Sequence, residues 1–472
     1  MIFSALFNRF VDKSPICVMV RAVLERVFSN ENIDQIFERT AQKQYTRELL
    51  FSTLAHLMIQ VVFKISPSVR AAYQAAIKDM TVSITSIYNK LNGVEIQVAA
   101  ALVRECALQL APLIRQMKGG ASPLLPGYRI KYLDGNHLSG TEHRIEELRF
   151  EAAGALPGFG LVILEQALML ITHVILCEDG HAQERSLLEQ VLETLKKRDL
   201  IIADRNFCTS GFLFGIDRRG AFFVIRQHAS NLRWRRIGRR RRVGVVETGR
   251  VYEQVVELTD PATGKTLRAR RITVELNEPT RDGDTELHIL TNLPESDADG
   301  CTVAELYRTR WTIETGFQEI TETLDCEIET LGYPQASLFA FCLALMAYNA
   351  VSVIKAAMRV AHGEQTVKDE VSAYYMTLEV AAVYEGMMIA IPDEEWAVFG
   401  AMSNREFAQF LVNIAKSVYL PKYQKHVRGP KKPPPERRSG AMIKHLSTAR
   451  ILAQRKGKIR QKVRETTPTT AP

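Results

Sequence analysis

The segment from residue 128 to residue 226 constrains the fold most strongly, because its apolar residues follow the short runs and two-residue period of β-strands. Two amphipathic stretches, 181–198 and 209–219, interrupt the strands and predict helices. The predicted order is β-β-β-α-β-α-β, which indicates an α/β protein. A chain of 472 residues is long enough for about two to four domains. The strands are predicted at 128–135, 160–164, 168–177, 200–205 and 221–226.

The rest of the chain divides by composition and period. Apolar residues repeat with helical spacing before residue 118, and a Gly-Gly-Ala-Ser-Pro run at 119–123 marks a boundary. We therefore predict a multidomain α/β architecture with six regions. These are a helical N-terminal domain (1–118), the first part of an α/β core (119–227), a mostly β insertion (228–300), the rest of the core (301–361), a helical C-terminal region (362–420) and a basic, disordered tail (421–472).

Three acidic residues occupy positions that the predicted elements bring together. Asp134 ends the first predicted strand, Asp204 ends the fourth, and Glu314 lies on a helix predicted over 303–324. Central strands of a sheet lie side by side, so two acids at strand ends can lie close together, and the helix then brings the third acid across them. Carboxylates this close repel one another unless a divalent cation lies between them.

The chemistry of such a site follows from its oxygen ligands. All-oxygen ligands suit Mg²⁺ or Mn²⁺ better than zinc, and two such ions about 4 Å apart can activate a water or a 3′-hydroxyl for attack on a phosphodiester. Arg205, Tyr307 and Arg310 lie near the acids and can hold phosphate oxygens. The alternative interpretation of the helix is a solvated ion pair between Arg310 and Glu314, which are four residues apart.

Charge is unevenly distributed along the chain, whose net charge is +8. Residues 422–464 hold fifteen Lys or Arg and one acid, for +14, which leaves −6 for the remainder. A near-neutral body with a basic tail indicates a polyanionic partner, above all nucleic acid. A tail that only aids solubility is the alternative.

Cysteine usage and hydropathy predict a cytoplasmic protein. The seven cysteines are scattered and form no C-x-x-C pair, which favours a reducing compartment and argues against a structural zinc site. No signal-peptide pattern is evident at the N-terminus. Residues 338–354 are mostly apolar, with Asn349 among them, but this stretch is at the short limit for a membrane span. We therefore expect a buried core helix there and no membrane partner.

Three sequence blocks resemble the motifs of bacterial insertion-sequence transposases of the DDE type, and more narrowly those of the IS-four group, whose third block carries a Tyr-Arg-Glu-Lys signature. The resemblance implies a ribonuclease-H-like catalytic core with a β insertion between the second Asp and the Glu, and 109 residues lie between Asp204 and Glu314 here. The family lysine is expected seven residues after Glu314, where this chain has Thr321. The blocks are Leu133-Asp134-Gly135-Asn136, Ala203-Asp204-Arg205-Asn206-Phe207 and Tyr307-x-x-Arg310-Trp311-x-Ile313-Glu314.

The function that the resemblance implies is DNA transposition. Such an enzyme cuts the 3′ ends of an insertion sequence and joins them to target DNA, with Mg²⁺ or Mn²⁺ held by Asp134, Asp204 and Glu314. Its expected partners are double-stranded DNA at terminal inverted repeats, target DNA and a second copy of the chain on that DNA, in the bacterial cytoplasm at the nucleoid. Two alternatives stay open: a catalytically silent DNA-end-binding repressor, which Thr321 favours, and a general nuclease of the same fold.

An arginine-rich segment of the insertion supplies further candidates for DNA binding. Trp234, Arg235 and Arg236 belong to a run with seven arginines in ten residues, 233–242. Some relatives hold a flipped base with an aromatic side chain of the inserted domain, and an indole among arginines can stack on a base beside neutralised phosphates. Packing of Trp234 on its own β domain is the alternative. Residues 82–93 resemble the second helix of a helix-turn-helix, with an ordinary bundle helix as the alternative.

Overall fold

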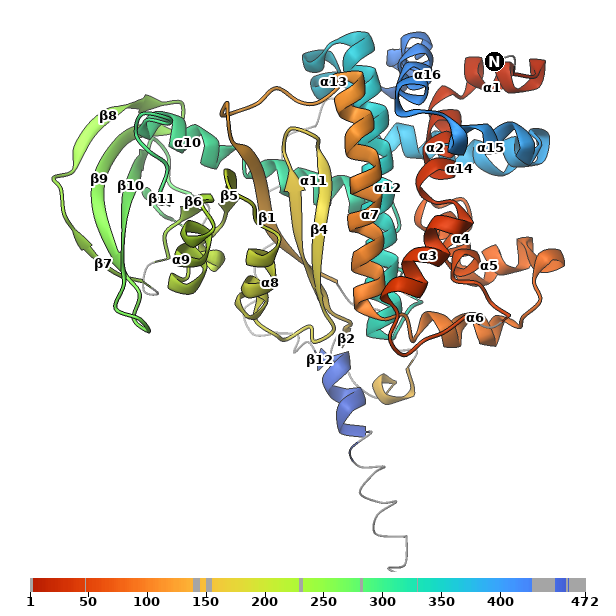
Figure 1. The fold of residues 1–472 in the computed structure, drawn as a ribbon, viewed down its shortest axis with the longest axis horizontal. Coiled ribbons are helices and arrows are strands. Elements are labelled where there is room, and N and C mark those ends of the chain that lie inside the picture. The colour runs from red at the N-terminus through yellow and green to blue at the C-terminus, as the bar shows by residue number, and fades with distance from the viewer. Residues whose placement is uncertain are drawn as a thin grey trace, which may run out of the picture.

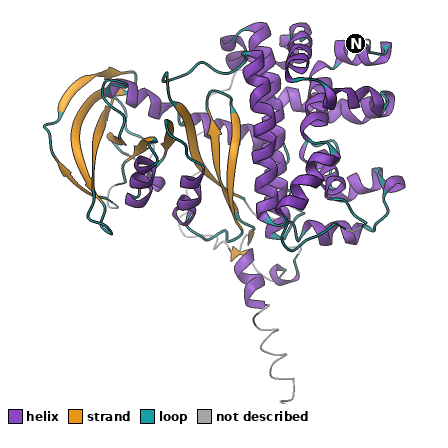
Figure 2. Ribbon diagram, viewed as in Figure 1, coloured by secondary structure: helices purple, strands orange, loops and turns teal. Residues whose placement is uncertain are grey.

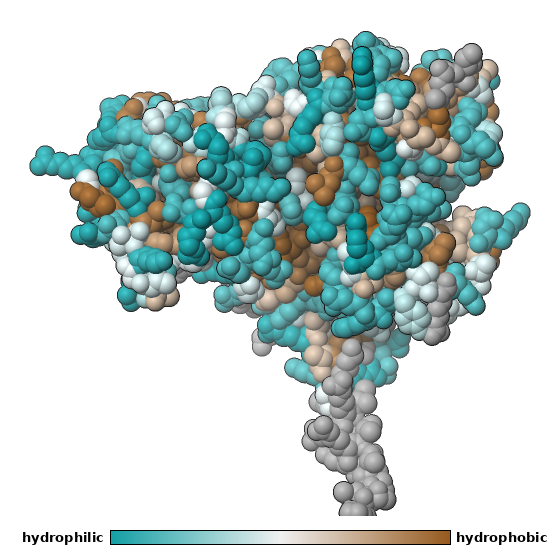
Figure 3. Space-filling model, in the orientation of Figure 1, coloured by the Kyte–Doolittle hydropathy of each residue, from teal (hydrophilic) through white to brown (hydrophobic). Residues whose placement is uncertain are grey.

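A large mixed sheet and a layer of helices make up the protein, and they occupy opposite sides of the molecule in Figure 2. The face drawn in Figure 3 is mostly hydrophilic, with small hydrophobic patches between the polar side chains. The computed structural model describes residues 3–46, 48–138, 145–149, 155–228, 232–280, 283–328, 330–426, 446–455 and 457.

Within the described residues, the sheet has ten strands in the order β4-β3-β1-β5-β6-β11-β10-β9-β7, with β8 paired to β9 (Figure 1). In its first half, β1 is antiparallel to β3 and β3 to β4, whereas β5 runs parallel to β1 and β6 parallel to β5. The predicted strand order along the chain is thus present in one mixed sheet. These strands are β1 (Arg129–His137), β3 (Phe159–Glu165), β4 (Leu170–Cys177), β5 (Asp199–Ala203) and β6 (Phe222–Arg226).

The β insertion continues the same sheet. Its last strand, β11, pairs antiparallel with β6 through Thr291, Leu290 and Ile289, so the free edge of β6 is covered by the inserted strands. A residue-level pattern can predict the inserted strands, but it does not predict which edge they join. They are β7 (Arg233–Arg236), β8 (Arg241–Val246), β9 (Gly249–Thr259), β10 (Thr266–Leu276) and β11 (Glu286–Thr291).

Helices from the two ends of the chain share one hydrophobic core. The long helices α7 and α12 pack against each other and against β4, and most of the other helices of the two ends lie on their side away from the sheet (Figure 1). The N-terminal helices are α1 (Ala5–Lys13), α2 (Pro15–Val27), α3 (Asn30–Thr40), α4 (Phe51–Val62), α5 (Val69–Ala75), α6 (Ile84–Leu91) and α7 (Ile96–Met117). The C-terminal helices are α12 (Pro334–His362), α13 (Glu364–Glu370), α14 (Ala373–Ala390), α15 (Asp393–Ala401) and α16 (Asn404–Ser417).

Two of these helices, α7 and α12, are long and apolar enough to cross a membrane by length and composition. The apolar stretch of α12 is wholly buried inside the protein, as a core helix requires. Asn349 lies within this stretch, is fully buried, and bonds to the backbone of Ile171 on β4. The Asn349 side chain accepts from the Ile171 N–H at 2.8 Å and donates to the Ile171 carbonyl at 2.9 Å. The amide therefore satisfies backbone groups at the edge of the sheet.

The helix predicted over 303–324 is wrong at its centre, because the chain forms two helices with a turn between them. These are α10 (Gly300–Arg308) and α11 (Trp311–Thr323). At the break, the Thr309 hydroxyl donates to the Leu306 carbonyl at 2.6 Å and accepts from the Tyr132 hydroxyl at 2.9 Å. The contact between Thr309 and Tyr132 of β1 thus competes with a regular helix at this point. A local sequence pattern cannot reveal this contact, because its partner lies on a distant strand.

Shorter elements also depart from the sequence-based prediction. The helix predicted over 181–198 is only α8 (Leu188–Glu193), preceded by a 3₁₀ turn. The first strand extends beyond Asp134 to His137, so Asp134 lies within β1 instead of ending it. The remaining described elements are α9 (Ser210–Arg218), β2 (Ala155–Leu156), and the 3₁₀ helices η1 (Ile77–Asp79), η2 (Glu146–Leu148), η3 (Glu184–Leu187), η4 (Arg205–Phe207) and η5 (Leu420–Tyr423).

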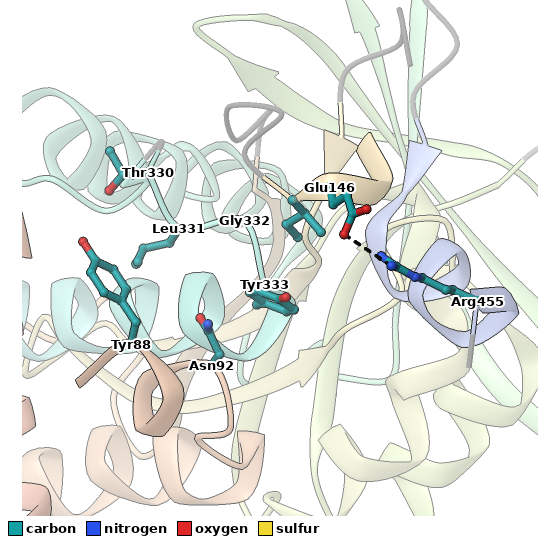
Figure 4. Close-up of a pocket in the computed structure, with 9 residues that line it drawn as sticks. Tyr88, Asn92, Glu146, Thr330, Leu331, Gly332, Tyr333 and Arg455 are labelled. Atoms are coloured by element: carbon teal, nitrogen blue, oxygen red, sulfur yellow. Dashed lines mark hydrogen bonds and ion pairs between the residues drawn. The ribbon is translucent and has the colours of Figure 1, made fainter. Parts of the chain in front are cut away.

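Parts of the basic tail pack on the rest of the protein, in contrast to the predicted disorder from residue 421, namely residues 421–426 and 446–455. Strand β12 (Leu446–Ser447) pairs with β2, and Arg450 donates to Asp179 at 2.8 Å. Figure 4 shows Arg455 beside Glu146, at the edge of a cavity of about 300 Å³ that Tyr88 of α6 and Asn92, the residue after this helix, line from the other side. Residues 427–445 and 458–472 lie outside the described part of the tail.

Candidate active site

Asp134, Asp204 and Glu314 converge from three elements. Asp134 lies on β1, and Asp204 directly follows the neighbouring strand β5, whose last residue pairs with Leu133. Glu314 lies in the first turn of α11, which packs against β1. The two strands are part of the buried sheet, so they hold the first two carboxylates rigidly, and the turn before α11 sets the position of the third.

Arg310 lies between these carboxylates. Its Nη1 is 2.5 Å from Glu314 Oε1 and 3.8 Å from Asp134 Oδ2. The ion pair foreseen as the alternative interpretation is therefore present, but only 13 % of the Arg310 side chain is exposed, so the pair does not lie on a solvated helix face. Tyr307 also accepts a hydrogen bond from Arg310. The helix break places both residues against the acids.

The acids carry more negative charge than their surroundings neutralise. The pKa of Asp134 is raised from 3.8 to about 7, chiefly by burial; Arg310 and a hydrogen bond from the Gly135 N–H oppose the rise, and the charges of Asp204 and Glu314 add to it. Burial also raises the pKa of Asp204, where the Glu184 charge adds to the effect. Closely spaced carboxylates with too little positive charge near them are the setting in which a divalent cation is stabilised.

Glu184 is a fourth acid that the sequence did not predict. It lies on η3, and its Oε1 occupies the space that a side chain at position 135 would need, which only glycine leaves open. The same oxygen is 3.6 Å from Nε2 of His137, whose ring stacks on Phe159 at 4.7 Å between centroids. The glycine after Asp134 was the available signal, but nothing in the sequence identifies the acid that approaches it.

The donor set fits a divalent cation in its chemistry, since all three candidate ligands are carboxylates. Within the described residues, however, no three His, Cys, Asp or Glu side chains form a group that could hold a metal ion as they stand. The Arg310 guanidinium lies between Asp134 and Glu314 in this arrangement. A metal at this position would therefore require Arg310 and Glu314 to separate.

The other predicted DNA contacts fall into two groups. Arg205 begins η4 directly after Asp204, beside the acids together with Tyr307 and Arg310. Trp234, Arg235 and Arg236 lie instead on β7, with β6, β11, β10 and β9 between it and β5, so the structure does not bring them to the acids.

Trp234 packs on its own part of the sheet, as the alternative interpretation expected. Its indole is half-buried against the apolar cluster on that face, and the Arg271 guanidinium lies 5.1 Å from the ring centroid. Arg235 is ion-paired to Glu257 at 2.6 Å, although its side chain is 74 % exposed. These side chains form a surface that is separate from the acids.

Residues 126–350 match the family model described as the transposase DDE domain. This match supports a DDE transposase. The matched span contains all three acids and the whole insertion. DDE transposases generally use divalent metals, in agreement with the carboxylate donor set.

Comparisons with whole chains add little to this assignment. No curated protein matched the sequence. Among solved structures, a piggyBac transposase in a synaptic complex with hairpin DNA is similar to this chain at 10 % identity and a TM-score of 0.38. The similarity covers 92 % of this chain and 90 % of that chain.

Proposed function

We propose that the protein is a DNA transposase of the IS-four group of bacterial insertion sequences, with Asp134, Asp204 and Glu314 as its catalytic acids. The observation that carries this proposal is the convergence of these acids on Arg310 within a span that matches the transposase DDE domain. The order and directions of β4, β3, β1, β5 and β6 support a ribonuclease-H-like core.

The three carboxylates would hold Mg²⁺, for which Mn²⁺ can substitute. When bound, the metal supplies activation of a water or 3′-hydroxyl and stabilisation of the leaving oxygen of the phosphodiester. The chain itself fixes two ligands on rigid strands and keeps the Arg310 guanidinium beside them. Once separated from Glu314, Arg310 can donate to phosphate oxygens, with Tyr307 and Arg205 adjacent.

In the proposed reaction, the enzyme cuts the 3′ ends of its element and the freed 3′-hydroxyl attacks target DNA. Its partners are double-stranded DNA at terminal inverted repeats, target DNA and a second copy of the chain on that DNA, in the bacterial cytoplasm. The basic tail and the β7 arginines supply phosphate contacts away from the acids, and such contacts add affinity without sequence preference.

A plasmid assay tests this proposal. The protein is incubated with Mg²⁺ and a supercoiled plasmid that carries the inverted repeats flanking its gene, and a matched plasmid lacks them. We expect 3′ nicks at the repeats and none in the control plasmid. Equal cutting of both plasmids would show a general nuclease, and binding of the repeats without any nick would show the silent protein described next.

A second candidate function is a silent repressor that binds element ends. Thr321 favours it, because the family lysine is replaced by a hydroxyl that bonds back to the Phe317 and Gln318 carbonyls at 3.1 Å each. No cation is then offered to DNA phosphate from this position. The three acids and Arg310 remain in place, however, which favours the enzyme.

A further inference from the structure

Arg271 of β10 is a cation that none of the sequence motifs identified, and the sheet connects it to the strands that carry the acids. It pairs with Leu290 of β11, and the same cross-strand row continues through Ile225 of β6 to Ala203, the residue before Asp204. Residues paired in such a row point to the same face of a sheet. Neighbouring strands lie about 4.8 Å apart, so the three steps from β5 to β10 amount to about 14 Å.

The side chain of Arg271 is held from two sides, on the face of the inserted sheet that α10 does not cover. Its neighbour Ile272 points the other way, into the core that α10 shares. Arg271 Nε donates to Gln227 Oε1 at 2.7 Å, and the guanidinium carbon lies over the Trp234 ring, 5.1 Å from its centroid. Neither Nη nitrogen donates a hydrogen bond within the described residues, and both reach the surface. The guanidinium is therefore fixed in place while its two outer NH₂ groups stay available.

Positive charge around Arg271 exceeds negative charge. Glu286 is the acid that acts most strongly on it, and Glu286 is already ion-paired to Arg240 at 3.0 Å. The nearby Arg236 is exposed, and neither it nor Arg271 forms an ion pair with any described residue. Burial lowers the pKa of the Arg271 guanidinium, Glu286 opposes this, and the charges of Arg236 and Arg240 lower the pKa further. Cations crowded in this way are stabilised by an anion from outside.

We propose that Arg271 binds a backbone phosphate of the DNA that flanks the cut, and that Trp234 holds the guanidinium in position for it. The inference rests on the proposed function, because it takes the DNA of the element as the anion. A guanidinium with two available NH₂ groups suits phosphate oxygens in a bidentate arrangement. The distance of about 14 Å from β5 corresponds to about four phosphates of one DNA strand at 3.4 Å each. Arg271 thus contacts flanking DNA, not the phosphate that is cut.

Trp234 is a positioning residue in this arrangement and does not hold a flipped base. Arg271 covers one face of the indole, and the indole also packs against the apolar cluster that includes Leu258. A cation over an indole face is attracted by the ring, which restrains the guanidinium. A base could stack on that face only after displacing Arg271. Loss of Trp234 and loss of Arg271 should therefore affect the same contact.

Fluorescence anisotropy of the full-length protein, with a chelator present, tests the phosphate contact. Two labelled duplexes of equal length are used, one with an element end and one of unrelated sequence. Arg271→Gln should weaken binding of both about tenfold, because a hydrogen bond to a charged group is lost, and should lower the slope of log affinity against log salt by about 0.9. Arg271→Lys should recover most of the slope. Arg268→Gln is the matched control and should bind like wild type, since Arg268 is exposed on the same strand but points to the other face.

Trp234 variants test the positioning role. Trp234→Leu should weaken binding of the intact duplexes less than Arg271→Gln does, Trp234→Phe should recover most of the loss, and the double variant should bind no more weakly than Arg271→Gln alone. Additive losses, or a Trp234→Leu loss confined to DNA with an unpaired base, would overturn this role.

Equal affinities and equal salt slopes of Arg271→Gln and Arg268→Gln would overturn the phosphate contact. Thermal melts show whether each variant keeps its fold, and Arg271→Lys decides the matter if Arg271→Gln melts early. The variants are compared on both duplexes, so a missing preference for the element end would count against the transposase and would leave this comparison intact.

Discussion

At the scale of single residues, the candidate site is defined by carboxylates that are close together and only partly neutralised. Asp134 is affected by Asp204 and Glu314, while Arg310 is the one cation that contacts two of the acids among the described ion pairs. This imbalance affects how the protein titrates, even before any metal or DNA is added.

Asp134→Asn should stabilise the metal-free protein at high pH. The folded-state pKa of Asp134, about 7, exceeds its ordinary value of 3.8, so the folded protein binds more protons and loses stability as pH rises between these values. Asparagine avoids this cost. In thermal melts with a chelator, the melting temperature of the variant should exceed that of wild type at pH 8, and the difference in melting temperature should be smaller at pH 5. An equal difference in melting temperature at both pH values would contradict a raised pKa of Asp134.

Gly135→Ala should reduce stability by about 0.5–1.5 kcal/mol, the order of cost of forcing one flexible side chain, here Glu184, out of its rotamer. The added methyl would collide with Glu184 Oε1 and force that side chain away from His137. Gly211→Ala on α9 is the matched control, because a methyl there meets nothing within 4 Å and alanine favours a helix. Urea denaturation should separate the two variants. Equal stabilities would show that Glu184 does not approach Gly135.

Sequence patterns could predict the three acids but not their surroundings. Asp134, Asp204 and Glu314 were candidates from the predicted strands and helix together with the family resemblance of the three sequence blocks. The approach of Glu184 to Gly135 depends on a loop conformation, and the central position of Arg310 depends on a turn that Tyr132 stabilises from a distant strand.

At the scale of elements, the contact between α12 and β4 joins the helical layer to the sheet. Asn349 provides its polar part through two hydrogen bonds to Ile171, in the middle of the mostly apolar stretch of α12. The sequence shows that this residue interrupts the apolar run, and the structure shows which backbone groups need it.

Asn349→Leu should destabilise the protein by about 2–4 kcal/mol, because the buried N–H and carbonyl of Ile171 would both be left without a partner. Asn413→Leu on α16 serves as the control, since Asn413 is exposed and bonds only to Gln409. Chemical denaturation of both variants measures the difference. A destabilisation no larger than that of the control would mean that the two hydrogen bonds to Ile171 contribute nothing to stability.

Element types were more predictable than element boundaries and partners. The mostly β character of the insertion was predicted, yet the continuation of the β6 edge by β11, β10 and β9 is a long-range pairing that no local period encodes. The break between α10 and α11 escaped prediction for the same reason, because its partner Tyr132 is 177 residues away in sequence from Thr309.

At the scale of the whole molecule, charge is concentrated at the C-terminal end while both ends of the chain contribute to one helical core. The charge asymmetry is visible in the sequence. The shared core is not, because it depends on packing between helices more than two hundred residues apart, such as α7 and α12.

Truncation after Arg455 should make DNA affinity less dependent on salt. It removes five Lys or Arg residues but keeps the docked segment 446–455 and its hydrogen bond to Asp179. The slope of log affinity against log salt should fall by up to about 0.9 for each DNA phosphate that the shortened tail no longer neutralises. Fluorescence anisotropy over a KCl series measures it, with a full-length variant carrying Gln at the same five positions as the charge control. If the slope of log affinity against log salt stayed the same in the truncated protein and in the Gln variant, this part of the tail would be excluded from DNA binding.

The most direct test of the account measures DNA cutting and DNA binding together in acid variants. Asp134→Asn, Asp204→Asn and Glu314→Gln should each bind a plasmid bearing the element ends yet leave no detectable 3′ nick in Mg²⁺. Glu322→Gln, an exposed acid on the same helix as Glu314, should cut like wild type. Cutting at the wild-type rate by any one of the three variants would contradict a single site built from these acids.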